Sequence, residues 1–273
     1  MKLKNYEFKS DPYQHQLDTL KSSAHRNLFA LFLEMGLGKS KILLDNAGML
    51  FEEGKISGLL IVSPKGNLNN WDSNEISRHL PERIKRNVLV WQPNHTQRWT
   101  KAFKDMVQND STGVLNIFLV NVEAFATVKA CTHVEEFLVT HDAMMAIDES
   151  TTIKNPKAKR TKHLIKLGPL ADYRRILTGF PITKAPLDLY SQCYFLSPNL
   201  LGFSSFYAFQ ARYAITQSRQ MGRHAFQQVM GFQKLDELQE SIKDFSIRRR
   251  KEECLDLPPK VYTRRMVELT PEQ

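Results

Sequence analysis

The stretch Glu34-Met35-Gly36-Leu37-Gly38-Lys39-Ser40 decides the fold, because it joins the apolar run Asn27–Leu33 to the helical pattern Lys41–Glu53. A strand, a glycine-rich loop and a helix in this order are the context that a phosphate-binding loop requires. The strict pattern has a glycine five residues before Gly38, where this chain has Leu33. An ordinary glycine turn that caps a helix is therefore the alternative, and the flanking strand and helix favour the phosphate-binding interpretation.

The residue types within this loop suit a nucleotide polyphosphate with Mg²⁺. Gly36 and Gly38 allow the backbone N–H groups around Leu37 to close on phosphate oxygens. Lys39 offers a positive charge to the β and γ phosphates, and the hydroxyl of Ser40 is a ligand for Mg²⁺. The loop therefore predicts that these five residues bind the phosphates of a nucleotide together with Mg²⁺.

Short apolar runs alternate with amphipathic stretches over the first two thirds of the chain. Such runs are typical of strands buried on both faces of a parallel sheet. The helical patterns between them imply βαβ crossovers, and thus a doubly wound, mostly parallel α/β sheet that binds ligands at the carboxyl ends of its strands. The predicted strands are Asn27–Leu33, Leu59–Ser63, Val88–Trp91, Ile117–Val120, Met144–Ile147 and Arg175–Leu177, with helices at Lys41–Glu53 and Thr96–Val107.

The pattern changes after Pro186, where aromatic residues become frequent. Two helices, a β-hairpin, a third helix and a final strand are predicted at Leu187–Leu196, Ser205–Tyr213, Tyr213–Phe232, Leu235–Phe245 and Val261–Leu269. We therefore expect a nucleotide-binding lobe, a helical protrusion with a hairpin, and a return strand with the start of a linker, over residues 1–185, 186–260 and 261–273.

The formal net charge of +9 favours a polyanionic partner, because each phosphate that Lys or Arg neutralises releases counterions. The stretch between Glu149 and Asp172 contains no acidic residue. It holds six basic ones, namely Lys154, Lys157, Lys159, Arg160, Lys162 and Lys166. A solvated helix face gives the same pattern, so this stretch is open to both interpretations.

Composition also bears on the compartment. No apolar stretch is long enough to span a bilayer, so no membrane partner is expected, and no apolar run follows Met1-Lys2-Leu3-Lys4 as in a secretory signal. Cys131, Cys193 and Cys254 lie far apart, which suits reduced thiols better than disulfides or a zinc site. We expect a cytoplasmic protein of a bacterium or phage-infected cell, or a nuclear one in a eukaryote.

A second candidate site lies where the run Met144–Ile147 leads directly into Asp148-Glu149. Two carboxylates at the carboxyl end of a buried strand cost folding free energy unless a cation or a proton neutralises them. Asp148 is therefore a candidate ligand of Mg²⁺, and Glu149 a candidate for polarising the attacking water, beside Lys39 as the third catalytic residue. An acidic helix N-cap is the alternative, and the upstream phosphate loop favours the catalytic interpretation.

Taken together, these blocks resemble the Swi/Snf-like DNA translocases of helicase superfamily 2. They occur in the family's order and span nearly the whole chain, as Pro12-Tyr13-Gln14, Glu34–Ser40, Ile61–Pro64 with Asn70-Trp71, Val120–Glu123, Asp148–Asn155, Leu177–Ile182, and Arg248-Arg249 with Leu257–Lys260. The resemblance implies the first RecA-like lobe of a DExx-box ATPase, with the segment after Pro186 as its protrusion.

The resemblance also implies further site residues. Gln14 corresponds to the glutamine that contacts adenine. Six residues are implied to lie towards nucleic acid or to couple to it, namely Pro64, Lys65, Asn121, Lys154, Thr178 and Gly179. Such motors grip the phosphate backbone, so the expected partner is DNA, duplex or branched, with little base specificity.

Some positions depart from the family's pattern: Leu33 replaces an acidic residue, Ser40 and Phe180 each replace a threonine, Thr151 replaces a histidine, and Lys184 an asparagine. The Mg²⁺ and water chemistry is kept. The changes instead affect the coupling of hydrolysis to movement.

The family also needs a second RecA-like lobe that carries an arginine finger, either in the same chain or in a separate one. We therefore expect the ATP-binding lobe of an ATP-dependent helicase or translocase, nearly inactive as an ATP hydrolase when isolated. Two alternatives are a nucleic-acid-binding regulatory module that binds ATP without productive hydrolysis, and an unrelated P-loop enzyme such as a small-molecule kinase.

Overall fold

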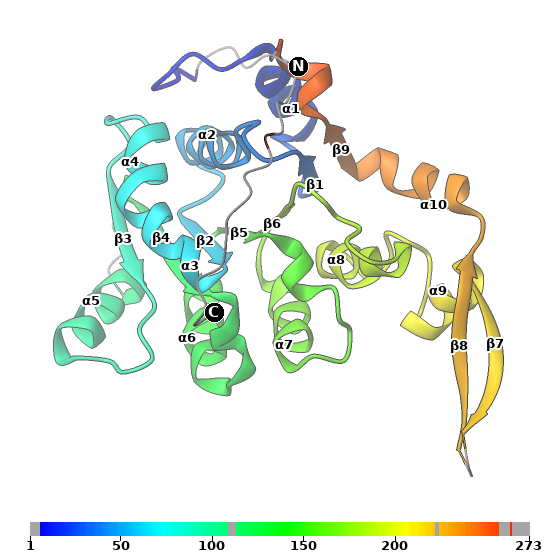
Figure 1. Ribbon diagram of the computed structural model, residues 1–273. Helices are drawn as coiled ribbons and strands as arrows, with labels where there is room; N and C mark the ends of the chain where they lie inside the picture. Colours follow the sequence, from blue (N-terminus) through cyan, green and yellow to red (C-terminus); the bar gives the residue numbers. More distant parts are fainter. Residues whose placement is uncertain (1–5, 109–112, 222–223, 257–262, 264–273) are drawn as a thin grey trace, which may run out of the picture.

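One seven-stranded parallel sheet organises the chain, in the order β3-β4-β2-β5-β6-β1-β9 (Figure 1). The computed structural model describes residues 6–108, 113–221, 224–256 and 263. The strands are β1 Leu28–Leu33, β2 Gly58–Ser63, β3 Arg86–Val90, β4 Leu115–Asn121, β5 Ala143–Asp148, β6 Tyr173–Leu177 and β9 Ser246–Arg249. The predicted doubly wound parallel sheet is confirmed, and each of the six strands predicted before residue 180 is present.

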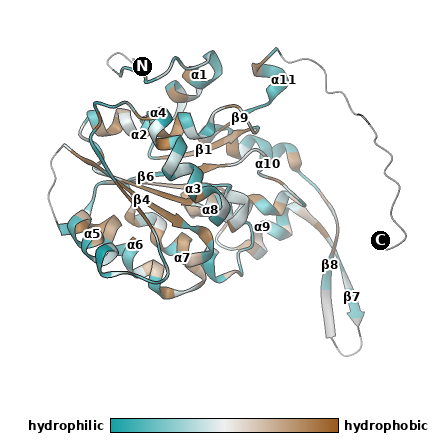
Figure 2. Cartoon of the chain, turned by 60° about the vertical axis from the view of Figure 1, so that its left-hand side comes forward, coloured by the Kyte–Doolittle hydropathy of each residue, from teal (hydrophilic) through white to brown (hydrophobic). Residues whose placement is uncertain are grey.

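The strands are apolar at consecutive positions because the sheet is covered on both faces. In β2, Leu59 and Ile61 pack into one hydrophobic core and Leu60 and Val62 into the other. Figure 2 shows these hydrophobic strands between two layers of helices with more hydrophilic outer sides. One layer consists of α1 Gln14–Ser23, α2 Lys39–Glu52, α3 Lys65–Asn70 and α4 Ile76–His79, and the other of α5 Gln97–Gln108, α6 Val128–Thr140, α7 Lys159–Leu167 and α8 Leu189–Leu196.

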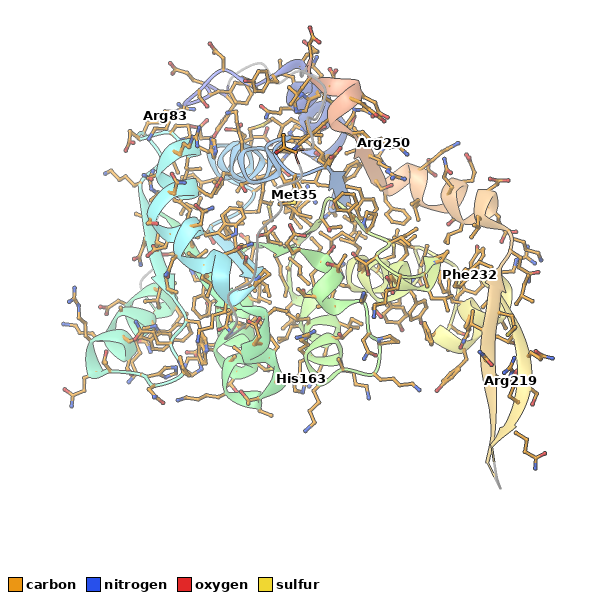
Figure 3. The ribbon with its side chains drawn as sticks, in the orientation of Figure 1. Met35, Arg83, His163, Arg219, Phe232 and Arg250 are labelled. Carbon is orange, nitrogen blue, oxygen red and sulfur yellow. The ribbon has the colours of Figure 1, made fainter. Side chains whose placement is uncertain are left out.

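The protrusion leaves the sheet after α8 and returns to it through β9. It consists of α9 Phe206–Tyr213, the antiparallel ribbon of β7 Ala214–Met221 and β8 His224–Phe232, and α10 Leu235–Ile242. The ribbon extends away from the body of the molecule, and Arg219 projects from it into solvent (Figure 3). The predicted hairpin is therefore confirmed. None of the helices among the described residues is long and apolar enough to cross a membrane.

Strand β9 is the element that the sequence pattern missed. It falls within the segment 186–260 that we predicted as protrusion, yet it pairs in parallel with β1, with Leu33 beside Arg249. Its four residues include Arg248 and Arg249, which conceal it within a basic run. The predicted return strand Val261–Leu269 lies outside the described residues. The division of the chain into segments 1–185, 186–260 and 261–273 stays a prediction, although β9 itself belongs to the main sheet.

A buried arginine ties helix α1 to this sheet. Arg175 of β6 is fully buried and donates hydrogen bonds to the side chain of Asn46 (3.1 Å) and to the backbone carbonyls of Asn27 (3.1 Å) and Ser23 (3.0 Å). Burial lowers its pKa to about 9, so the guanidinium stays charged at neutral pH. The carbonyls at the carboxyl end of α1 carry partial negative charge, which stabilises this cation.

We predict that Arg175→Met destabilises the chain by roughly 3 kcal/mol, because it leaves several buried carbonyls without donors. Urea denaturation at neutral pH measures the difference. Arg174→Met is the matched control, since Arg174 is the preceding residue of the same strand and only partly buried. Equal stability of the two variants would show that the Arg175 bonds do not hold α1 in place.

Candidate functional site

The loop between β1 and α2 has the backbone of a phosphate cradle. Gly36 and Gly38 have φ angles of +84° and +79°, a region that favours glycine. Leu37 between them is fully buried and anchors the loop, while the N–H of Ile42 donates to the carbonyl of Gly38 (3.0 Å) and begins α2. The N–H groups at the start of this helix have no intrahelical acceptor. The loop can therefore donate to an anion.

Lys39 is the positively charged group of this loop. Its Nζ donates to the carbonyl of Leu33 (3.1 Å), and the side chain is partly buried. Burial lowers the pKa of Lys39, the carboxylates of Glu149 and Asp148 raise it, and the nearby Lys251 lowers it again. A partly buried ammonium that is bonded to a backbone carbonyl is suited to exchange that carbonyl for a phosphate oxygen.

Asp148 ends β5 as a buried and firmly oriented carboxylate. Its Oδ2 accepts from Ser63 Oγ (3.0 Å) and from Trp71 Nε1 (3.0 Å), and its Oδ1 accepts from the backbone N–H of Glu149 (3.0 Å). Both donors to Oδ2 come from the segment of β2 and its following helices. The orientation of Asp148 is thus fixed by residues that the sequence placed only in a separate motif.

Glu149 stands in a strained backbone conformation at the start of a 3₁₀ turn, with φ of 47°. Its Oε2 accepts from Thr178 Oγ1 (3.2 Å), so the acidic pair and the end of β6 are joined. Burial and the neighbouring Asp148 raise the pKa of Glu149, against the lowering effects of Lys39 and Thr178. Non-glycine residues in this region are strained and occur at functional sites.

The turn after β6 packs directly on the phosphate loop. A Cβ at Gly179 would lie 3.4 Å from the backbone nitrogen of Met35 and 3.5 Å from the carbonyl oxygen of Leu33. The next residue, Phe180, is 56% exposed. Thr178 and Gly179, predicted as coupling residues, therefore contact the acidic pair and the loop, respectively.

A pocket of about 540 Å³ opens at the loop, where the ammonium and hydroxyl groups predicted to bind phosphate and Mg²⁺ meet helix α1. Its lining includes Gly36, Gly38, Lys39 and Ser40. Four predicted loop residues thus share one pocket. The backbone of this loop, the ammonium of Lys39 and the hydroxyl of Ser40 are donor and ligand groups that fit a polyphosphate with Mg²⁺.

Gln14 is not part of this pocket. It is exposed and donates to Asp18 Oδ1 (2.9 Å). Gln16 lines the pocket instead, and its Nε2 donates to the carbonyl of Leu37 (3.2 Å). That amide lies 2.2 Å from the place of a Cβ at Gly38, so a side chain at position 38 would displace it. The structure therefore places Gln16, and not Gln14, in the lining of this pocket, while the contact of Gln14 with adenine stays a prediction.

Helical spacing explains the different positions of the two glutamines. Residues 14–23 form α1, in which Gln16 and Leu20, four residues apart, share the buried face, whereas Gln14 lies on the exposed face. The motif Pro12-Tyr13-Gln14 by itself does not indicate which side of the helix faces the pocket. An exposed ring, Tyr13, also lines the pocket beside Gln16.

A second groove of about 620 Å³ lies at the carboxyl ends of β2, β3 and β4. It brings together Lys65, which follows the N-cap Pro64 of α3, and Asn121 at the end of β4. Its lining also includes Trp91 and Lys129. Two predicted nucleic-acid residues from distant parts of the sequence thus line one depression, with Pro64 next to it.

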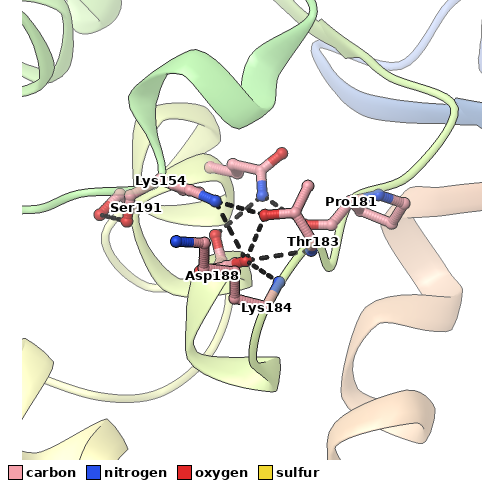
Figure 4. A network of polar contacts seen from close by, with 7 residues as sticks. Lys154, Pro181, Thr183, Lys184, Asp188 and Ser191 are labelled. Atoms are coloured by element: carbon pink, nitrogen blue, oxygen red, sulfur yellow. Dashed lines mark hydrogen bonds and ion pairs between the residues drawn. The ribbon is translucent and has the colours of Figure 1, made fainter. Parts of the chain in front are cut away.

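Lys154 lies elsewhere, in a network of its own (Figure 4). Its ammonium donates to Thr183 Oγ1 and lies 3.6 Å from a carboxylate oxygen of Asp188. Asp188 also accepts from the backbone N–H groups of Thr183 (3.0 Å) and Lys184 (2.9 Å). This network joins the segment after the acidic pair to the segment after Gly179, and the role of Lys154 towards nucleic acid or in coupling stays a prediction.

Comparison with known proteins agrees with this geometry. The chain matches the family model of the SNF2-related domain over residues 15–273. It is 30% identical over 232 residues to the DNA annealing helicase and endonuclease ZRANB3 of Bos taurus, across 85% of this chain and 20% of that protein. It is 38% identical over 130 residues to TATA-binding protein-associated factor 172 of Homo sapiens, across 46% of this chain and 7% of that protein.

Among solved structures, the chain is similar to the SWI2/SNF2 ATPase core of Sulfolobus solfataricus in complex with dsDNA. The TM-score is 0.66 at 24% sequence identity, over 91% of this chain and 46% of that chain, which shows a shared RecA-like fold. This chain therefore spans less than half of the solved core and 20% of the bovine relative. Because the family model covers nearly every residue, the resemblance is confirmed: the chain belongs to the SNF2-related domain family.

Proposed function

We propose that this chain is the nucleotide-binding lobe of an ATP-dependent DNA translocase. The observation that carries the proposal is the meeting of three segments at the carboxyl edge of one parallel sheet. The loop with Lys39 follows β1, the pair Asp148 and Glu149 ends β5, and Thr178 follows β6. Lobes that bind nucleotides in open parallel sheets use this edge.

In this proposal the loop and the acidic pair share the chemistry of ATP hydrolysis. Lys39 and the loop N–H groups bind and orient the phosphates, and Ser40 and Asp148 hold Mg²⁺ directly or through water. The metal, when bound, neutralises charge that develops on the phosphate oxygens. Ser63 and Trp71 keep Asp148 in one orientation, since both donate to its Oδ2.

Glu149 is the proposed base that polarises the attacking water. Its raised pKa makes it a better proton acceptor than an ordinary carboxylate, and Thr178 holds it towards the end of β6. The hydrogen bond from Thr178 also connects Glu149 to the turn at Gly179, which packs on the phosphate loop. This intact arrangement favours a hydrolase over a regulatory module that only binds ATP.

DNA is the proposed track, and the groove with Lys65 and Asn121 its proposed contact. The Sulfolobus relative was solved in complex with dsDNA. The groove carries amide and ammonium groups at the open edge of the sheet, as a phosphate backbone requires. A second RecA-like lobe is the proposed far wall of the ATP site and supplies the arginine that stabilises the transition state.

We predict that Gln16→Ala weakens ATP binding about tenfold, because Gln16 lies in the pocket and supports the loop through Leu37. Gln14→Ala, two residues away on the exposed face of the same helix, is the matched control and should bind like the unchanged chain. GTP binding, measured beside ATP by titration calorimetry, shows whether the loss is specific to adenine. A larger effect at Gln14 than at Gln16 would contradict this prediction and favour Gln14 as the adenine contact.

We predict that Glu149→Gln makes the chain more stable at pH 7. The raised pKa means that the folded state binds the Glu149 proton more tightly than the unfolded state does. The unchanged chain therefore loses stability as the pH rises through the ordinary glutamate pKa towards the raised one, and the variant does not. Urea midpoints of the two proteins should differ at pH 7 and converge near pH 4. The same difference in urea midpoint at pH 7 and at pH 4 would contradict the view that burial destabilises the Glu149 carboxylate.

We predict that Lys65→Glu weakens binding of duplex DNA for every sequence alike and lowers the slope of log affinity against log salt by about 1, because one phosphate contact is lost. Lys85→Glu changes the charge equally but lies exposed before the amino end of β3, at the opposite edge of the sheet. Fluorescence anisotropy over a salt series gives both slopes. Equal effects of the two substitutions would assign the binding to net charge rather than to the groove.

A further inference from the structure

The end of β9 and the start of helix α11 (Lys251–Cys254) lie against the phosphate loop, although Lys251 and Glu34 are 217 residues apart in sequence. The N–H of Glu34 donates to the carbonyl of Arg249 (3.0 Å). In return, the N–H of Lys251 donates to Glu34 Oε2 (2.9 Å). Figure 3 shows Met35 of the loop and Arg250 of this segment on the same side of the sheet. Two hydrogen bonds thus fix the backbone at Lys251 relative to the loop.

The side chain of Lys251 extends over the loop from this fixed point. Its Cε and Nζ lie 3.4 Å and 3.6 Å from the position that a Cβ at Gly36 would occupy. Gly36 itself is exposed and faces the phosphate pocket. The ammonium therefore stands next to the glycine whose left-handed backbone shapes the cradle.

The charges around Lys251 leave its ammonium available. The carboxylate of Glu34 accepts from the backbone N–H of Lys251, and Glu252 pairs with the side chain of Arg250. Glu253 accepts from the backbone N–H of Arg250 (3.0 Å). Within the ranges that the structure describes, the Lys251 ammonium forms no ion pair. It is also close enough to Lys39 to lower the pKa of that residue.

Two ammonium groups held close together at a partly buried loop repel each other unless an anion lies within reach of both. Lys39 meets the loop from α2, and Lys251 meets it from β9 and α11, so the two charges reach the same cradle from separate elements. A polyphosphate is the anion that this cradle suits, because it offers several charged oxygens along the loop.

We propose that Lys251 is a second phosphate-binding cation of the nucleotide site and that the β9–α11 segment is one wall of it. The inference rests on the proposed function, since it requires nucleotide at the loop. Its chemical consequence is selectivity for charge: Lys251 contributes to the affinity for ATP and ADP, and little to that for AMP.

The test is nucleotide affinity of the 273-residue chain, measured by titration calorimetry with ATP, ADP and AMP. Lys251→Met keeps most of the aliphatic stem over Gly36 and removes only the charge. We expect it to weaken ATP binding about tenfold and AMP binding less than about twofold. Lys251→Arg keeps the charge and should stay within about threefold of the unchanged chain for ATP. Lys85→Met, which removes an exposed charge at the far edge of the sheet, should bind like the unchanged chain.

Each other outcome overturns the inference. Unchanged ATP affinity in Lys251→Met would assign the side chain to packing on Gly36 alone. Equal losses for ATP and AMP, or equal losses in Lys251→Met and Lys251→Arg, would indicate a displaced loop rather than a lost charge. Lys39→Met separates this inference from the proposed function. If Lys39→Met weakens ATP binding and Lys251→Met does not, only the role of Lys251 fails; if neither does, the nucleotide site itself fails.

Discussion

The pairing of β1 with β6 on one side and β9 on the other is the constraint on which the site depends. Parallel pairing in register places the ends of neighbouring strands at one edge. Leu31 lies beside Leu177 and Leu33 beside Arg249, so Thr178 and the segment of Lys251 emerge next to the phosphate loop. Because most of β1 and the second half of β6 are buried, a shift in register by one residue would turn their side chains to the opposite face of the sheet. The sheet therefore positions the reactive groups with the same contacts that stabilise the fold.

Charge is the second constraint, because burial disfavours the charged forms of the carboxyl and ammonium groups at the site. Asp148 is satisfied by Ser63 and Trp71, and its orientation costs nothing further when a metal ion arrives. Glu149 and Lys39 both have pKa values shifted towards their neutral forms by burial. Such groups reduce stability in the empty state and become useful when a ligand of opposite charge enters. The proposed site therefore gains its missing charge partners only when nucleotide binds.

Sequence reasoning recovered the elements whose signal is local. The strand before the loop, the glycines and the acidic pair each stand within a continuous apolar or motif context, and the sheet followed from their alternation. The contacts that depend on three-dimensional position do not follow from such local signals. Gln14 and Gln16 are equivalent in composition, and only the helical phase of α1 places Gln16 on the loop. β9 was missed because the partner that makes it a strand, β1, lies more than 200 residues away. The partners of Lys154, Thr183 and Asp188, lie about thirty residues further along the chain, so no local pattern in the sequence indicates these contacts.

The central claim is that this chain binds nucleotide by itself but supplies only one wall of the catalytic site. The most direct measurement follows ATP binding and phosphate release on the same preparation of the 273-residue chain, with and without duplex DNA. The account predicts one ATP site per chain that is lost in Lys39→Ala, with phosphate release near background and unaffected by DNA. An arginine finger contributes about 10³–10⁵-fold to related reactions, so its addition with a second lobe should be needed for turnover. Failure to bind ATP, or robust DNA-stimulated hydrolysis by the isolated monomer, would contradict the account.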